Sequence, residues 1–129
     1  MVKILVIEDE KDIRHLLIYT LQYAGFNVIS GRDGEEAVRL ADEEIPDIIL
    51  MDVRMPRLDG YEACKMIKAN EKTAHIPVMF LSAKGQDTEI DKGFEAGASD
   101  YLLKPFTPTE LIERVKLTLK ENKISQENE

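Results

Sequence analysis

The stretch Asp47-Ile48-Ile49-Leu50-Met51-Asp52 is a continuous apolar run that ends at a carboxylate. A strand of a parallel sheet is buried on both faces, so it reads as an unbroken apolar run, and the first polar residue after it lies at the rim of the sheet. A second run, Ile4-Leu5-Val6-Ile7, ends in the same way at the acid pair Glu8-Asp9. In α/β sheets this rim is where ligands bind.

Two further apolar runs end at residues with useful chemistry: residues 78–81 lead into Ser82, and residues 101–103 lead into Lys104. Three acids, a hydroxyl and an amine therefore occupy strand ends. Close carboxylates repel one another, and a hard divalent cation such as Mg²⁺, which prefers oxygen ligands, can neutralise them. This combination fits phosphoryl transfer, in which a protein mainly positions the group and stabilises its charge.

Strand-like runs alternate with helical patterns along the whole chain. The strands are expected at residues 3–7, 26–30, 47–51, 77–82 and 100–103, and the helices at about 11–24, 35–44, 60–69, 87–96 and from Pro108 onward. This alternation predicts an α/β fold with a parallel sheet, right-handed crossovers and helices on both faces.

Turn and capping residues mark the ends of several helices. The first helix is expected to stop at Gly25, and Asp59 to cap the third. The core-facing stripe of the first helix is expected to contain Ile13, Leu16, Leu17, Leu21 and Ala24. After Leu119 there is little apolar surface to bury, so we expect one domain over residues 1–121 with a fraying helix end, followed by a disordered polar tail over 122–129.

Composition narrows the function classes. The chain has 129 residues, 43% hydrophobic, with a formal net charge of −8. Acidic character argues against direct binding of nucleic acid, which depends on clustered Lys and Arg. No apolar run approaches the roughly 20 residues that span a bilayer, and no secretory signal precedes the first strand, so a cytoplasmic protein is expected. The lone Cys64 is expected to be an inert packing residue.

Taken together, these motifs closely resemble the receiver domain of bacterial two-component response regulators. The motifs are Glu8-Asp9, Asp52 followed by Met55-Pro56 and Asp59-Gly60, Ser82-Ala83, and Tyr101 with Lys104-Pro105-Phe106. The resemblance covers nearly the whole chain and implies a flavodoxin-like, doubly wound five-stranded sheet in the order 2-1-3-4-5 with five helices.

The resemblance also implies the roles of the acidic residues. Asp52 would accept a phosphoryl group from a phosphohistidine on a sensor histidine kinase or a histidine phosphotransfer protein. Asp9 and Asp52, with Glu8 directly or through water, and the backbone carbonyl of Arg54 would hold Mg²⁺, with Mn²⁺ as a substitute. Such a domain is a phosphoacceptor that assists its own phosphorylation and dephosphorylation, and is not an enzyme with a separate substrate.

Further roles follow from the same resemblance. Lys104, before a cis peptide bond to Pro105, would pair with the phosphoryl group or with Asp52, and Ser82 and the backbone N–H of Ala83 would bind phosphoryl oxygens. Tyr101 would move inward with Ser82, or else stay half-buried in both states. The face formed by the fourth helix, fifth strand and fifth helix would then change for partners, including homodimerisation, to which Asp100 and Arg114 could contribute.

Three further positions each allow two interpretations. In the family that the chain resembles, the positions of Arg54 and Lys84 flank the path of the attacking water, so these residues either modulate the lifetime of the phosphoryl group or are solvated rim charges. Ile18 lies off the core stripe of the first helix and is either an anchor for kinase docking or a single exposed apolar residue.

Two other classes remain open. An aspartyl-phosphate hydrolase of the haloacid dehalogenase type would use the same nucleophile, but normally carries a second aspartate where this chain has Arg54. A receiver-like adaptor could bind partners without phosphorylation. The chain could also be a stand-alone regulator or a receiver from a longer one.

Overall fold

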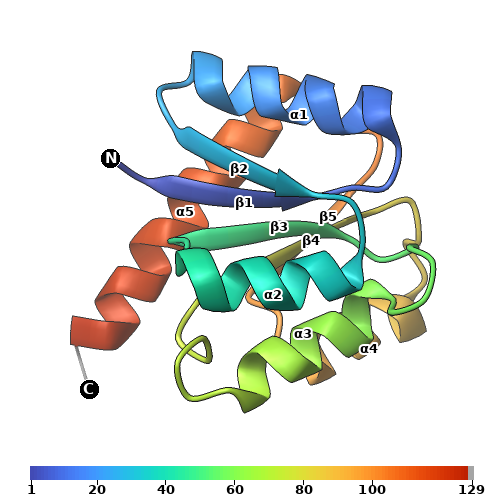
Figure 1. Ribbon diagram of the computed structural model, residues 1–129. Helices are drawn as coiled ribbons and strands as arrows, with labels where there is room; N and C mark the ends of the chain where they lie inside the picture. The colour runs from blue at the N-terminus through green and yellow to red at the C-terminus, as the bar shows by residue number, and fades with distance from the viewer. Residues whose placement is uncertain (128–129) are drawn as a thin grey trace.

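The structure is a computed structural model that describes residues 1–127, with side chains described through residue 124. Its elements, in chain order, are β1 Lys3–Ile7, α1 Lys11–Tyr23, β2 Asn27–Gly31, α2 Gly34–Glu44, β3 Ile48–Asp52, α3 Gly60–Ala69, β4 Val78–Ser82, α4 Asp87–Glu95, β5 Asp100–Leu103 and α5 Pro108–Glu127. The strands form one parallel sheet in the order β2-β1-β3-β4-β5, which confirms the predicted flavodoxin-like fold (Figure 1).

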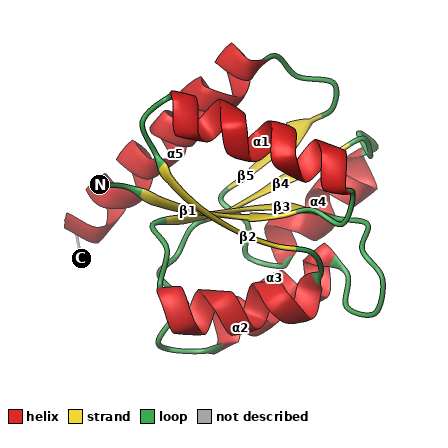
Figure 2. Ribbon diagram, turned by 45° about the horizontal axis from the view of Figure 1, so that its top comes forward, coloured by secondary structure: helices red, strands yellow, loops and turns green. Residues whose placement is uncertain are grey.

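The sheet is the middle of three layers. Figure 2 shows α1 and α5 on one face and α2, α3 and α4 on the other. Alternate residues of β1 enter different cores: Ile4 and Val6 pack with α1 and α5, whereas Leu5 and Ile7 pack with α2 and α3. Because successive strand side chains point to opposite faces, strands buried on both faces must be apolar at every position. This is why the continuous apolar runs identified the strands.

Helix ends largely follow the predicted signals. Gly25, with φ +95°, terminates α1, and its amide donates to the Gln22 carbonyl while the amide of Phe26 donates to the Leu21 carbonyl. This pair of bonds is a Schellman motif, which favours glycine at the left-handed position.

The strands β2 and β3 each lie one residue later than predicted, so Asp52 is the last residue of β3.

The predicted stripe of α1 is wrong at Leu16, whose exposed fraction is 64%. Leu17 and Leu21 are buried, and Ile13 is partly buried in the same core. The outer side of α1 has no helix packed against it, since α5 is its only helical neighbour on this face of the sheet among the described residues (Figure 2). An apolar residue on that side therefore faces solvent.

The structure also differs from the prediction at the carboxyl end. The helix α5 continues to Glu127, past residue 121, where the polar tail was expected to begin. Lys, Glu and Gln in this segment have good helix propensity, which accounts for continued helix without much apolar burial. Residues 128–129 lie outside the described residues. Over the described part of the chain, no helix is both long and apolar enough to cross a membrane.

Candidate metal and phosphoryl site

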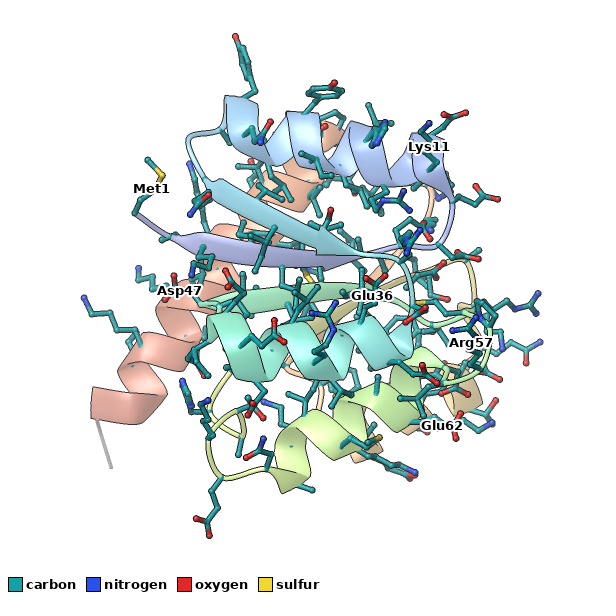
Figure 3. All side chains as sticks on the ribbon, viewed as in Figure 1. Met1, Lys11, Glu36, Asp47, Arg57 and Glu62 are labelled. Carbon is teal, nitrogen blue, oxygen red and sulfur yellow. The ribbon has the colours of Figure 1, made fainter. Side chains whose placement is uncertain are left out.

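The carboxyl ends of the strands lie at one edge of the molecule. In Figure 3, Lys11, which begins α1 after β1, lies at the same edge as Arg57 and Glu62, which follow β3. Met1 and Asp47, which precede β1 and β3, lie at the opposite edge. Parallel pairing thus brings together side chains that are far apart in the sequence, as the strand-end argument predicted.

Three carboxylates meet at this edge. One oxygen from each of Glu8, Asp9 and Asp52 lies within 4.8 Å of the others. These residues line a hollow of about 260 Å³ together with Arg54 and Lys104. Glu8 is buried, Asp52 is partly buried and Asp9 is exposed, so the cluster is open to solvent on the Asp9 side.

Glu8 is the most constrained of the three acids, with an exposed fraction of only 1%. Its Oε1 accepts a hydrogen bond from Lys104 Nζ at 3.2 Å, whereas Oε2 is buried without a hydrogen-bond partner among the described residues. Burial, and then the negative charge of Asp52, raise the pKa of Glu8 to about 7, against the opposing effect of Lys104. An unpaired buried carboxylate oxygen is costly. The donor set therefore fits a small divalent cation.

Lys104 supplies the positive charge of the site. Its Nζ lies 3.2 Å from Glu8 Oε1 and 3.8 Å from Asp52 Oδ2. The peptide bond between Lys104 and Pro105 is cis, as the resemblance implied. The pairing with Asp52 predicted from the sequence is present, but Glu8 is the nearer partner.

Asp52 is held by the start of α3. Its Oδ1 accepts a hydrogen bond from the Val53 amide at 2.8 Å, and the Val53 carbonyl accepts one from the Gly60 amide at 2.9 Å. A Cβ added at Gly60 would lie 2.5 Å from the Asp52 carbonyl oxygen, so this position requires glycine. Asp59 caps α3 in a reciprocal capping box with Glu62, which confirms the predicted cap.

A second hollow, of about 290 Å³, lies beside Asp52. It is lined by Arg54, Ser82, Ala83, Lys84 and Lys104 as well as by Asp52. All the residues predicted to surround the phosphoryl group therefore line one space. Arg54 is exposed, and Lys84 Nζ lies 3.7 Å from Glu89 Oε2.

Ile18, the residue of α1 predicted as a possible anchor for kinase docking, is half-buried.

Ser82 and Tyr101 are joined through the backbone of one residue. Ser82 Oγ accepts a hydrogen bond from the Lys84 amide at 3.0 Å, and the Tyr101 hydroxyl donates to the Lys84 carbonyl at 3.0 Å. Tyr101 is buried, with its side chain turned inward. Two contacts here were not predicted: the hydroxyl of Tyr61 lies 3.2 Å from that of Tyr101 and also contacts Glu89. In the sequence, Tyr61 is only one apolar position among several in α3, so it carries no signal of this contact.

Comparison with known proteins agrees with this geometry. The family model of the response regulator receiver domain matches residues 4–116. The chain therefore belongs to the receiver domains of response regulators, which act in two-component signalling and are phosphorylated by histidine kinases. This membership leaves the hydrolase alternative without support.

Among curated proteins, the chain is 46% identical over 125 residues to the alkaline phosphatase synthesis transcriptional regulatory protein PhoP of Bacillus subtilis, covering 95% of this chain and 50% of that protein. It is 40% identical to the probable transcriptional regulator ycf27 of Guillardia theta, covering 92% of this chain and 45% of that protein. The chain thus spans about half the length of these relatives.

Solved structures give the same assignment. A putative response regulator from Chloroflexus aurantiacus superposes with a TM-score of 0.87 at 38% identity, over 92% of this chain and 97% of that one. The receiver domain of the sensor histidine kinase PA1611 from Pseudomonas aeruginosa superposes with a TM-score of 0.86 at 35% identity, over 92% of this chain and 97% of that one. That structure has a magnesium ion coordinated in its active site cleft.

Proposed function

We propose that Asp52 accepts a phosphoryl group from a phosphohistidine of a sensor histidine kinase or a histidine phosphotransfer protein, and that this changes the surface formed by α4, β5 and α5. The observation that carries the proposal is the convergence of Glu8, Asp9 and Asp52 within 4.8 Å, beside the ammonium group of Lys104. A solvated aspartate at a strand end would need neither the other acids nor the lysine.

Mg²⁺ would be held by Asp9, Asp52 and the backbone carbonyl of Arg54, with Glu8 contributing its unpaired oxygen directly or through water. The magnesium-bound Pseudomonas receiver supports this assignment. When bound, the ion would neutralise negative charge on the acids and on the phosphoryl group. Mn²⁺ would serve as a substitute, since it also accepts carboxylate and carbonyl oxygens.

In the transfer step, an Asp52 carboxylate oxygen attacks phosphorus and the P–N bond to the imidazole breaks. The electron pair of that bond returns to the ring nitrogen, and the product on Asp52 is an acyl phosphate. Lys104 would pair with one phosphoryl oxygen, while Ser82 Oγ and the Ala83 amide would donate to others; all three line the hollow beside Asp52. Preorganised donors of this kind stabilise charge on the transferring group. Water would later hydrolyse the acyl phosphate.

The signal would start at Ser82. When its hydroxyl donates to a phosphoryl oxygen, Ser82 would move toward Asp52, and the Lys84 amide, from which Ser82 Oγ now accepts a hydrogen bond at 3.0 Å, would follow or lose that bond. Because the Lys84 carbonyl holds the Tyr101 hydroxyl, movement of this loop would reach β5 and α4. Shifting a two-state equilibrium from 1:99 to 99:1 requires about 5.5 kcal/mol of differential interaction. Contacts from Ser82 and Lys104 to a doubly charged group would supply an interaction of this size.

Partners would read the changed surface of α4, β5 and α5, and a second copy of the chain is one such partner. Arg114 of α5 donates to Asp100 of β5 at 2.8 Å within the same chain. In a dimer through this surface, Asp100 and Arg114 would pair with Arg114 and Asp100 of the second copy, in place of their pairing within one chain or in addition to it. With a net charge of −8, the domain itself would not bind nucleic acid.

The test is intact-mass spectrometry after incubation with acetyl phosphate, with and without Mg²⁺. We expect one added phosphoryl group that requires the metal and is absent in Asp52→Asn. Beryllofluoride with Mg²⁺ should perturb the amide spectrum of the wild-type chain around Ser82 and Tyr101. A chain that remains unmodified and insensitive to beryllofluoride, yet still binds its partners, would be an adaptor that works without phosphorylation.

A further inference from the structure

The side chain of Tyr61 connects three elements of the sheet face that α3 and α4 cover. It belongs to the first turn of α3, and its ring packs edge-on against Phe80 of β4, with centroids 5.2 Å apart and planes at 74°. Phe80 also packs against the Tyr101 ring at 6.0 Å. The exposed fractions of Tyr61 and Tyr101 are 9% and 7%. The three rings therefore form one buried cluster.

The Tyr61 hydroxyl has three neighbours at hydrogen-bonding distance. The Glu89 carbonyl lies at 2.9 Å, Glu89 Oε2 at 3.0 Å and the Tyr101 hydroxyl at 3.2 Å. Glu89 belongs to α4, so Tyr61 bonds the helix and the β5 tyrosine from one atom. The Tyr101 hydroxyl also reaches the Lys84 carbonyl at 3.0 Å.

Each phenol carries a single proton, which limits how these contacts can be combined. In one arrangement, Tyr101 donates to the Lys84 carbonyl and Tyr61 donates to Glu89. In the other, Tyr101 donates to the Tyr61 hydroxyl, which still donates to Glu89. The second arrangement needs no contact with Lys84, so Tyr101 keeps an inward partner even if the Lys84 loop moves.

The charges around Glu89 favour Tyr61 as the donor. Burial raises the pKa of Tyr61 far above its usual value, so its hydroxyl stays protonated at neutral pH. The hydrogen bond from Tyr61 lowers the pKa of the Glu89 carboxyl. Lys84 Nζ and Lys92 Nζ lie 3.7 Å and 3.9 Å from the Glu89 carboxylate and keep it ionised. Hydrogen bonds to an ionised acceptor are stronger than neutral ones.

We infer that Tyr61 is a positioning residue of the switch: in the second arrangement its hydroxyl accepts from Tyr101 while it donates to Glu89 of α4, and so holds Tyr101 inward. The inference rests on the proposed function in one respect: only if Asp52 is phosphorylated does the position of the Tyr101 side chain report a signal. Among the described residues, Tyr61 forms no hydrogen bond with Lys104 or with the three acids of the metal site. It acts on the surface of α4 and β5 instead.

The test is the substitution Tyr61→Phe, which removes the hydroxyl and keeps the ring against Phe80. The readout is ¹⁹F NMR of 3-fluorotyrosine in a background with Tyr19→Phe and Tyr23→Phe, because both of those tyrosines are exposed. Tyr101 is then the only labelled residue in the variant. Removing one hydrogen bond should lower the inward-to-outward ratio of Tyr101 roughly two- to twelvefold. The Tyr101 signal should move toward its solvent-exposed position and become more accessible to a soluble paramagnetic quencher.

Two comparisons separate positioning from a general loss of structure. Glu89→Gln keeps an acceptor for Tyr61 and should leave Tyr101 largely inward, whereas a merely loosened core would show equal exposure in both variants. In a Tyr101→Phe background, Tyr61→Phe should cause no further change in beryllofluoride affinity, because the two hydroxyls act through each other.

Equal protection of Tyr101 with and without the Tyr61 hydroxyl would overturn the inference. The fluorine measurement on the unphosphorylated chain needs no phosphodonor. A wild-type chain that ignores beryllofluoride would therefore count against the proposed function alone, and would leave the measured effect of Tyr61 on Tyr101 standing.

Discussion

The carboxylate of Glu8 and the ammonium group of Lys104, 96 residues apart in the chain, meet at 3.2 Å. Lys104 is the nearest cation to a buried acid whose second oxygen has no partner among the described residues. One positive charge thus serves Glu8 and Asp52 together. The acid cluster is electrostatically incomplete without a further cation, and this imbalance leads to measurable consequences for pH and metal dependence.

The first concerns pH in the presence of a chelator. The pKa of Glu8 is raised from 4.5 to about 7 in the folded chain, so folding favours its protonated form. The stability that this contributes is complete below the unfolded pKa and is lost as pH rises through about 7. Urea unfolding should therefore give a free energy lower at about pH 8 than at about pH 5 by roughly 1–3 kcal/mol from this group. Glu8→Gln should flatten the difference; Glu10→Gln, at an exposed neighbour, should not.

The second concerns Mg²⁺ affinity. Asp9→Asn removes a charged oxygen ligand while keeping the size of the side chain, and should weaken Mg²⁺ binding by at least about tenfold, since even residues behind metal ligands contribute that much. Isothermal calorimetry measures the effect directly. Glu10→Gln changes the net charge by the same amount next to the site and serves as the control. Equal affinities for the two variants would remove Asp9 from the metal site.

A third prediction, independent of the charges at the site, concerns the entry to α3. Gly60→Ala places a methyl group 2.5 Å from the Asp52 carbonyl and 2.9 Å from the Val53 Cα, so the end of β3 must shift. We expect lower thermal stability and slower phosphorylation by acetyl phosphate, although alanine has a helix propensity about 1 kcal/mol better than glycine. Lys65→Ala, on the exposed side of the same helix, controls for propensity. An unaltered phosphorylation rate in a folded Gly60→Ala chain would contradict this account of how Asp52 is held.

The fourth concerns the lifetime of the acyl phosphate. Arg54 and Lys84 both line the hollow beside Asp52, and Lys84 is already paired with Glu89 at 3.7 Å. Replacing both with alanine opens the path of attacking water and removes two positive charges, so the dephosphorylation rate should change by more than about twofold, as a difference of roughly 0.5 kcal/mol would give. Decay of intact phosphorylated mass measures it. An unchanged rate would mean that these are solvated rim charges.

The fifth concerns the kinase. Ile18→Asp should slow phosphoryl transfer from the cognate histidine kinase and leave phosphorylation by acetyl phosphate intact, because a small donor needs no docking surface. The control is Leu16→Asp, at a position with an exposed fraction of 64% on a different side of α1. Equal slowing with both donors would indicate damage to the fold instead of lost docking.

Much of this fold follows from local patterns in the sequence. The apolar runs identified the strands, because a strand buried on both faces must be apolar at each position, and Gly25 and Asp59 marked helix ends through their own backbone preferences. The strand ends also predicted which residues would line the site. Leu16 was misplaced because helical period alone does not say how wide a stripe the neighbouring helices cover.

What the sequence by itself determined is the set of chemical groups at the rim: three carboxylates, a hydroxyl and a lysine, each at the end of a strand. Only the tertiary structure decided that Lys104 lies nearer to Glu8 than to Asp52, that one Glu8 oxygen is unpaired, and that Tyr61 reaches Tyr101 and Glu89. These contacts join residues from different strands and helices, and their distances depend on how the whole sheet and its covering helices pack. No local pattern encodes such distances.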